Sequence, residues 1–407
     1  LKQGHYYRLL ASATNGVGLE TGSPCPTPWV LVDTTPPTAG SVTLVQSPDD
    51  LAAYTASYSL ATGSYATHPT PAAFVANTHA LYVVLDGWSD AESGLYAYYA
   101  SATTLGGTPL VVDAYIQQVA TATLPVLGLS HLDQVRVSWR AINHAGLEVT
   151  AASNVVTIDA TPPVVMASHF VPGSVFINGV DYVSVTGKTP MTMRYDVSDP
   201  ESSVTAAHVC VGSFPGACDV MPKVPVDPRA RSATGTLNNL LDGFRYYPTV
   251  FATNGVGAES AATTAGFVVD NSPPLCELVY DGAGIDAAWV GDKSDLTVTW
   301  DPIVDAGSGV ASTRVAIKPR LSARGLGFEA VGVDVRSATL NVPWLEHNRS
   351  YVSVVEATDA LGNSIACLSN GFVTDFTPPS AGGVLSELGS AQIVDHLVHV
   401  SWYGFSD

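Results

Sequence analysis

Apolar residues occur along this chain in short runs that partly alternate with polar ones. The segment Leu296-Thr297-Val298-Thr299-Trp300 alternates strictly, which is typical of a strand with one buried face. Gly, Pro and Asn separate such runs, and no sustained 3.6-residue period is present. The pattern predicts an all-β chain of immunoglobulin-like or fibronectin-III-like sandwiches, with about seven strands per roughly 100 residues.

One motif occurs four times and marks a long internal repeat. It joins an aspartate to a Pro-Pro pair, at residues 32–37, 158–163, 269–274 and 374–379. The aspartates of successive copies are 126, 111 and 105 residues apart, so each repeat is a whole domain rather than a solenoid turn. Because proline fixes φ and restricts the preceding residue, each linker is expected to be short and stiff.

Two further motifs recur within each repeat. A run ending in Asn or Asp and Gly precedes every linker, at 13–18, 141–146, 252–257 and 357–362. We expect it to form the FG turn, since these residues supply the positive φ of a tight turn. A loop of the type Asp-x-x-Ser occurs earlier, at 90–94, 199–203 and 305–309, and is expected between strands B and C. Tyr246 and Tyr351 stand where a tyrosine corner begins strand F.

These motifs divide the chain into tandem modules forming an extended rod. The predicted units are a C-terminal part of a module (1–33), three complete modules (34–159, 160–270 and 271–375) and an N-terminal part of another (376–407). The first complete module is the longest, and its extra residues near 46–80 are expected to be an insertion on a loop or sandwich edge. Both ends look like cuts through a longer polypeptide.

The five cysteines have spacings that favour disulfides. Cys276 follows a linker and is expected on strand A, and Cys367 is expected on strand G. Strands A and G can be neighbours in such sandwiches, so we pair the two residues. Cys210 and Cys218 flank a turn-rich segment and are expected to form a local bridge. Cys25 occupies the place of Cys367 in the partial first unit, so its partner is expected outside this chain. Disulfides indicate an oxidising, extracellular compartment, whereas free buried thiols are the alternative.

Composition narrows the function classes. The net charge is −19, which argues against nucleic acid as a partner because nucleic-acid binding needs a basic surface. No run of about 18 apolar residues is present, so no membrane contact is expected. The triplet Asn348-Arg349-Ser350 is a candidate N-glycosylation site. No nucleophile elbow, His-Glu-x-x-His sequence or phosphate loop occurs, so we expect no enzymatic activity.

Oxygen-bearing residues are expected to converge where modules meet. The first set is Asp33, Asp90, Glu92 and Asn143, and the second is Asp159, Asp199, Glu201 and Asn254. Such oxygens suit Ca²⁺, so structural calcium at the junctions is one hypothesis. A third set keeps Asp270 and Asp305 but has Gly307 in place of the glutamate. This set should therefore bind Ca²⁺ more weakly than the other two. The alternative is that these side chains accept hydrogen bonds from backbone N–H groups in turns.

The order of motifs in each repeat resembles the immunoglobulin-like and fibronectin-III-like modules of giant surface proteins. The motifs that carry the resemblance are Trp300, the Asp-x-x-Ser-Gly loop, the strand-F tyrosine and the Asp-x-Thr-Pro-Pro linker. The Ala-, Gly-, Ser- and Thr-rich composition is similar to the ciliary surface glycoproteins of green algae, including the axial proteins of mastigonemes. The resemblance implies a glycosylated extracellular fibre protein at the cell or ciliary surface. The chain has no EGF-type cysteine cluster and no polyproline tract, which disfavours a stem subunit of mastigonemes.

Three functional hypotheses follow. The first is a structural rod segment of a filament or surface coat, assembled with copies of itself or with other extracellular proteins. The second is an adhesin or receptor ectodomain that binds glycans or proteins through its loops, which exposed aromatic residues such as Tyr54, Tyr58 and Tyr65 would favour. The third is a set of accessory modules of a carbohydrate-active enzyme whose catalytic part lies elsewhere.

Overall fold

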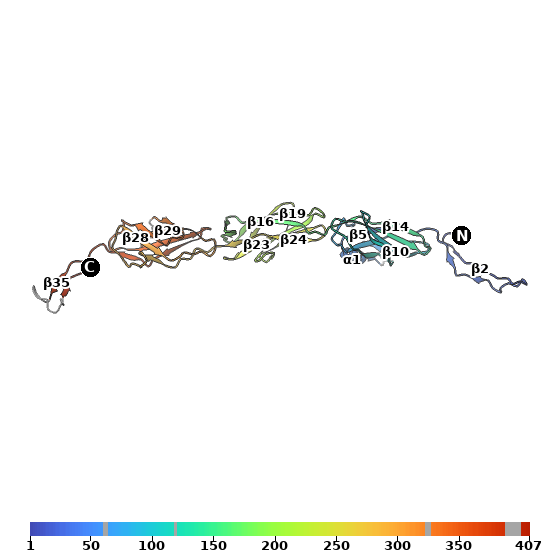
Figure 1. Cartoon of the computed structure of the whole chain (residues 1–407), viewed down its shortest axis with the longest axis horizontal. Helices are drawn as coiled ribbons and strands as arrows, with labels where there is room; N and C mark the ends of the chain where they lie inside the picture. The colour runs from blue at the N-terminus through green and yellow to red at the C-terminus, as the bar shows by residue number, and fades with distance from the viewer. Residues whose placement is uncertain (60–63, 118–119, 322–326, 387–399) are drawn as a thin grey trace.

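A computed structural model describes residues 1–59, 64–117, 120–321, 327–386 and 400–407. Parts of the predicted insertion (60–63) and of the last predicted unit (387–399) therefore lie outside the described residues. Three β-sandwiches follow one another along the long axis of the molecule, and the two ends of the chain lie at opposite ends of the row (Figure 1). The prediction of an all-β, extended chain of sandwiches is confirmed.

The first sandwich pairs a three-stranded sheet with a larger one. The smaller sheet has the order β12-β9-β5 and the larger β11-β10-β13-β15-β8, with β14 also pairing β13. Their bounds are β5 (Ser41–Val45), β8 (Phe74–Val75), β9 (Ala80–Asp86), β10 (Leu95–Thr104), β11 (Pro109–Ile116), β12 (Thr121–Pro125), β13 (Gln134–Asn143), β14 (Glu148–Ala152) and β15 (Val156–Ile158).

The second sandwich repeats this arrangement. Its sheets have the orders β16-β19-β22 and β17-β18-β25-β23-β20-β21, with β24 also pairing β23. Their bounds are β16 (Val164–Phe170), β17 (Val175–Ile177), β18 (Val180–Val183), β19 (Thr189–Ser198), β20 (Val204–Gly212), β21 (Met221–Val226), β22 (Ser232–Leu237), β23 (Arg245–Asn254), β24 (Glu259–Thr263) and β25 (Phe267–Val269).

The third sandwich has the same two layers. Its sheets have the orders β26-β28-β31 and β27-β34-β32-β29-β30, with β33 also pairing β32. Their bounds are β26 (Val279–Asp281), β27 (Trp289–Val290), β28 (Asp295–Trp300), β29 (Val310–Pro319), β30 (Glu329–Val331), β31 (Ser337–Asn341), β32 (Ser350–Asp359), β33 (Ser364–Leu368) and β34 (Phe372–Thr374).

The ends of the chain form short antiparallel pairs. Near the N-terminus β1 (Tyr6–Tyr7) pairs β4 (Val30–Leu31), and β2 (Leu10–Ala11) pairs β3 (Cys25–Pro26). Near the C-terminus β35 (Gly383–Ser386) pairs β36 (Val400–Tyr403).

Alternation along the strands builds a separate core in each sandwich. In β13 every second residue is buried, and Val135, Val137, Trp139 and Ala141 all have 0% exposure. These side chains point between the two sheets because successive residues of a strand face opposite sides. Phe267 on β25 and Phe372 on β34 have equivalent buried places in the second and third cores. Each core is closed within its own sandwich.

Tyrosine corners hold the turn before strand F. The hydroxyls of Tyr7, Tyr246 and Tyr351 accept hydrogen bonds from the backbone N–H groups five residues earlier, at 2.9, 2.8 and 3.0 Å. The first sandwich has Val135 at this place and closes its turn without the corner.

The described residues contain no helix that is long and apolar enough to cross a membrane.

The insertion of the first sandwich contains the helix α1 (Pro48–Ala56) and the hairpin β6 (Tyr58–Ser59) and β7 (Ser64–Tyr65). Ser47 caps α1 in a capping box with Asp50, and Pro48 occupies its first turn, which are strong helix-start signals. The helix covers the outer face of the smaller sheet, where Tyr54 packs with the buried residues Val45 and Val84. A second, small core results.

Two disulfides are present among the described residues. One joins Cys210 to Cys218 and the other joins Cys276 to Cys367, at sequence separations of 8 and 91 residues. Cys276 itself lies outside the strands, ahead of β26, whereas Cys367 lies on β33. The longer bridge therefore ties the first segment of the third sandwich to the opposite sheet. Cys25 is free and exposed.

Candidate functional site at the module junctions

We define junctions 1, 2 and 3 as the linkers at Asp33, Asp159 and Asp270, with the loops of the following sandwich that contact them. At every junction the linker aspartate directly follows, or nearly follows, the last strand of one unit. Its carboxylate accepts a hydrogen bond from the BC loop of the next sandwich at all three junctions. At junctions 1 and 2 it also accepts one from the asparagine of the FG loop. One side chain of the linker is thus bound by the sandwich that follows.

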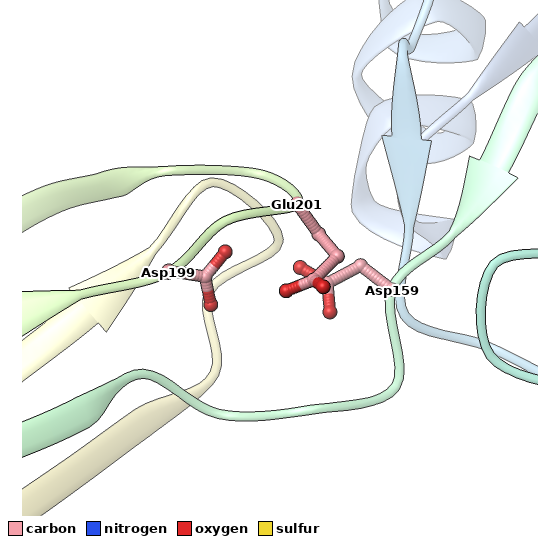
Figure 2. Close-up of side chains that lie close together, drawn as sticks. All are labelled: Asp159, Asp199 and Glu201. Carbon is pink, nitrogen blue, oxygen red and sulfur yellow. The ribbon is translucent and has the colours of Figure 1, made fainter.

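Junction 2 is the most buried of the three. Asp159 has 0% exposure and Asn254 has 1%. Figure 2 shows the carboxylates of Asp159, Asp199 and Glu201 pointing toward one another, and one oxygen of each lies within 4.8 Å of the others. All four predicted residues of this set therefore meet.

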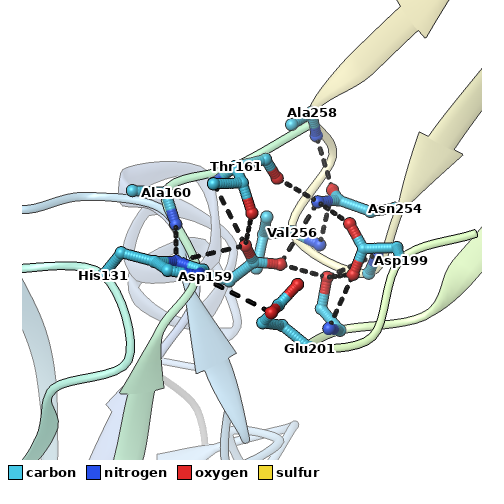
Figure 3. Close-up of polar contacts among 11 residues, drawn as sticks. His131, Asp159, Ala160, Thr161, Asp199, Glu201, Asn254, Val256 and Ala258 are labelled. Atoms are coloured by element: carbon cyan, nitrogen blue, oxygen red, sulfur yellow. Dashed lines mark hydrogen bonds and ion pairs between the residues drawn. The ribbon is translucent and has the colours of Figure 1, made fainter. Parts of the chain in front are cut away.

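Hydrogen bonds run through the middle of junction 2 (Figure 3). The Nδ2 group of Asn254 donates to Oδ2 of Asp159 at 3.2 Å, to Oδ2 of Asp199 at 3.1 Å and to the carbonyl of Thr161 at 3.0 Å. The hydroxyl of Ser202 donates to Oδ2 of Asp159 at 2.6 Å. The amide group of Asn254 therefore lies between the two aspartates, and both carboxylates accept a hydrogen bond from it without an ion.

Junction 1 repeats these contacts. Asn143 donates to Asp33 at 2.8 Å and to Asp90 at 3.1 Å, and Ser93 donates to Asp33 at 2.6 Å. The Ser93 hydroxyl, followed by the Gln3 amide, lowers the pKa of Asp33 to about 2. The fourth residue predicted here, Glu92, is exposed and belongs to no close carboxylate group of the described residues.

Junction 3 differs because an aspartate replaces the asparagine. Asp270, Asp305 and Asp359 lie with one oxygen of each within 4.8 Å, and Asp270 and Asp359 are both 3% exposed. Burial, together with the charges of Asp270 and Asp359, raises the pKa of Asp305. Gly307 is required here, since a Cβ at this position would lie 2.3 Å from Cγ of Asp270.

Several residues of these sites had no role in the predicted sets. The serines Ser93 and Ser202 were part of the loop motif but had no assigned role, and Asp359 was part of the FG motif. Their positions in the repeat were a usable signal, because each occupies the same place as a residue of the other junctions. His131 also occupies a repeated place, but the residue types there differ between the repeats, so no role was assigned to it. It lies on the preceding sandwich and accepts a hydrogen bond from the N–H of Ala160 at 3.2 Å.

Calcium at the junctions stays a prediction, and thermal unfolding in excess CaCl₂ against excess EDTA checks it. If Ca²⁺ binds only the folded chain and its free concentration is 100 times the Kd, binding would stabilise the protein by about 2.7 kcal/mol. The melting temperature would then rise. An unchanged melting temperature would support the hydrogen-bonded alternative. Substituting Asp359→Asn tests junction 3 separately, because it removes one of its three carboxylates.

Comparisons with known proteins give no family. No family model and no curated protein matches the sequence. Solved structures that resemble the chain include the FN1–FN3 domains of chicken CNTN1 (17% identical, 72% of this chain and 94% of that chain, TM-score 0.24). A Ca²⁺-stabilized adhesin of an Antarctic bacterium (12%, 91% and 81%, 0.38) and the Clostridium thermocellum CbhA fibronectin(III)-like modules (11%, 50% and 93%, 0.30) are also similar. With such low TM-scores, the fold assignment rests on the sheets described above.

Proposed function

We propose that this chain is a non-enzymatic, rigid segment of a large extracellular filament or surface-coat glycoprotein, which packs with neighbouring chains. The proposal includes module limits at the linker aspartates, so that each module spans 34–159, 160–270 or 271–375. The observation that carries it is the set of buried contacts at the junctions. A rod that transmits load needs junctions that resist bending, and each linker aspartate is bound both by the unit that it ends and by the sandwich that follows.

The insertion supports the structural role over an adhesive one. Tyr54 is 2% exposed and stacks on Tyr65 with ring centroids 4.1 Å apart, so these two aromatic rings are used for packing. Tyr58 also contacts Tyr65 but is 45% exposed. Gln46, beside the helix, donates from Nε2 to the carbonyl of Gly255 in the second sandwich at 2.6 Å. The insertion thus adds a direct contact between the two sandwiches at junction 2.

The compartment and surface are part of the same proposal. Two disulfides support an oxidising, extracellular environment. Asn348 is exposed on the turn before β32 and can be reached by a glycosylating enzyme. The resemblance to green-algal ciliary glycoproteins supports a ciliary surface as the location in this proposal, with copies of the protein or other surface proteins as its partners.

An adhesin or receptor ectodomain is the second candidate. A cleft of about 400 Å³ lies between α1, residues 67–74 and the loops that carry Ser202 and Gly255. Binding of a glycan or a peptide there would require two sandwiches together. A glycan array probed with the full chain tests this candidate directly.

Electron microscopy tests the rod. The full chain is expected to appear as straight particles with a narrow distribution of end-to-end distances, and the native parent protein as regular fibres with modules packed against neighbours. Particles bent at variable angles at the linkers would contradict the rigid rod. Isolated rods on a membrane, with free loops and glycan binding, would instead support the adhesin.

A further inference from the structure

The turn before strand F contacts the following linker in the same way in all four copies. A side chain in this turn accepts a hydrogen bond from the backbone N–H just after the linker aspartate. The acceptors are Gln3, His131, Asp242 and His347, and the donors are Thr34, Ala160, Asn271 and Phe376, at 2.6, 3.2, 2.6 and 3.1 Å. Each acceptor lies four residues before the tyrosine-corner position.

The next residue of the turn makes a hydrogen bond to the linker on the N-terminal side of the aspartate. In every copy its backbone N–H donates to the carbonyl of the residue just before the linker aspartate. The donors are Gly4, Leu132, Gly243 and Asn348, and the acceptors are Val32, Ile158, Val269 and Thr374, at 2.8, 2.7, 2.8 and 2.8 Å.

These four donors share an unusual backbone. Their φ angles are 71°, 71°, 76° and 54°, and two of them are not glycine. A left-handed Leu132 costs about 1–2 kcal/mol, and such strain persists only where the surroundings hold it. The turn is therefore held in this conformation by its two bonds to the linker.

We propose that this turn is a clamp that fixes the direction of each linker, and that the acceptor side chain is its positioning residue. The inference rests on the proposed rod function and explains how one module sets the direction of the next. The acceptors share no charge or shape, since they are an amide, two imidazoles and a carboxylate. Their common property is an acceptor atom within reach of one N–H group.

His131 extends the clamp to the following sandwich. Because Nδ1 accepts from Ala160, the proton of the neutral ring is on Nε2, which lies 3.6 Å from Oε1 of Glu201 (Figure 3). His131 thus contacts the linker with one nitrogen and faces the second sandwich with the other.

The experiment measures the distance across junction 2 in the full chain. Cys25→Ser removes the free thiol, and Thr150→Cys with Thr236→Cys provides exposed spin-label positions on the first and second sandwiches. Pulsed electron spin resonance then gives the width of the distance distribution. We expect His131→Ala to widen it at least twofold, and His131→Gln to keep it narrow because Gln3 fills the same role at junction 1.

The outcomes separate the clamp from the rod. A narrow distribution in both the parent chain and His131→Ala overturns the clamp and leaves the rod intact. A distribution that is already broad in the parent chain overturns the rod and the clamp together. Equal broadening in His131→Ala and His131→Gln overturns the assignment of the acceptor atom. Hydrogen exchange at the core strand β13 checks that the variants are folded.

Discussion

Removal of the Cys276–Cys367 disulfide is expected to lower the free energy of unfolding of the third sandwich by about 4–5 kcal/mol. The two cysteines are 91 residues apart, so the bridge closes nearly the whole sandwich into one loop. In the chain-entropy model, closing a loop of this length restricts the unfolded chain by about this amount. The bridge also joins the segment ahead of β26 to β33 in the opposite sheet. Hydrogen exchange of β28 and β32 in the double variant Cys276→Ser/Cys367→Ser measures the loss, because the fluorescence of the seven tryptophans of the chain does not report the third sandwich alone.

The second disulfide is a matched control within the same chain. Cys210 and Cys218 are only 8 residues apart, so the same model predicts a loss of about 2–3 kcal/mol, confined to the second sandwich. Hydrogen exchange followed strand by strand assigns each loss to its sandwich. Equal losses for the two double variants would contradict an explanation based on loop length.

The repeat made most of the fold predictable from the sequence. Linkers with an aspartate and Pro-Pro, and FG turns with Asn or Asp and Gly, occur once per module, so the modular plan did not depend on any single strand. Helix α1 was not predicted, although Ser47, Pro48 and Asp50 form a start signal for a helix. A helix of nine residues is too short to show a helical period, and packing of Tyr54 on the sheet adds to the stabilisation from the capping box.

The junctions were predicted in outline and not in detail. Loop order along the chain placed Asp159, Asp199 and Asn254 together, because the BC and FG loops share one end of a sandwich. The direction of an amide group is decided by neighbouring acceptors, so the bridge formed by Asn254 could not be read from spacing. Likewise Glu92 and Glu201 occupy equivalent positions, but only Glu201 faces a histidine of the preceding sandwich.

Substituting Asn254→Ala is expected to lower the stability of the second sandwich by about 3–4 kcal/mol. The side chain makes three donor contacts, and its Oδ1 accepts from the N–H groups of Val256 and Ala258 at 3.2 and 2.9 Å. Hydrogen bonds to charged groups contribute about 1.5–3 kcal/mol each, and a buried carboxylate left without its donor adds a desolvation cost. Hydrogen exchange of β23 measures the loss, since the second sandwich has no tryptophan.

Two variants separate the amide contacts from simple loss of packing. Asn143→Ala removes the equivalent side chain at junction 1, where Asp33 is more exposed than Asp159, so we expect a smaller loss there. Asn254→Asp keeps the volume but places a fourth carboxylate beside Asp159, Asp199 and Glu201, at the place that Asp359 occupies in junction 3. Its stability should improve as the pH falls, because protonation relieves the repulsion between buried like charges. If Asn254→Asp is as stable as the parent chain at neutral pH, the amide does not hold junction 2 together. In that case the stiffness of the rod would have to come from the clamp and from the contact between Gln46 and Gly255.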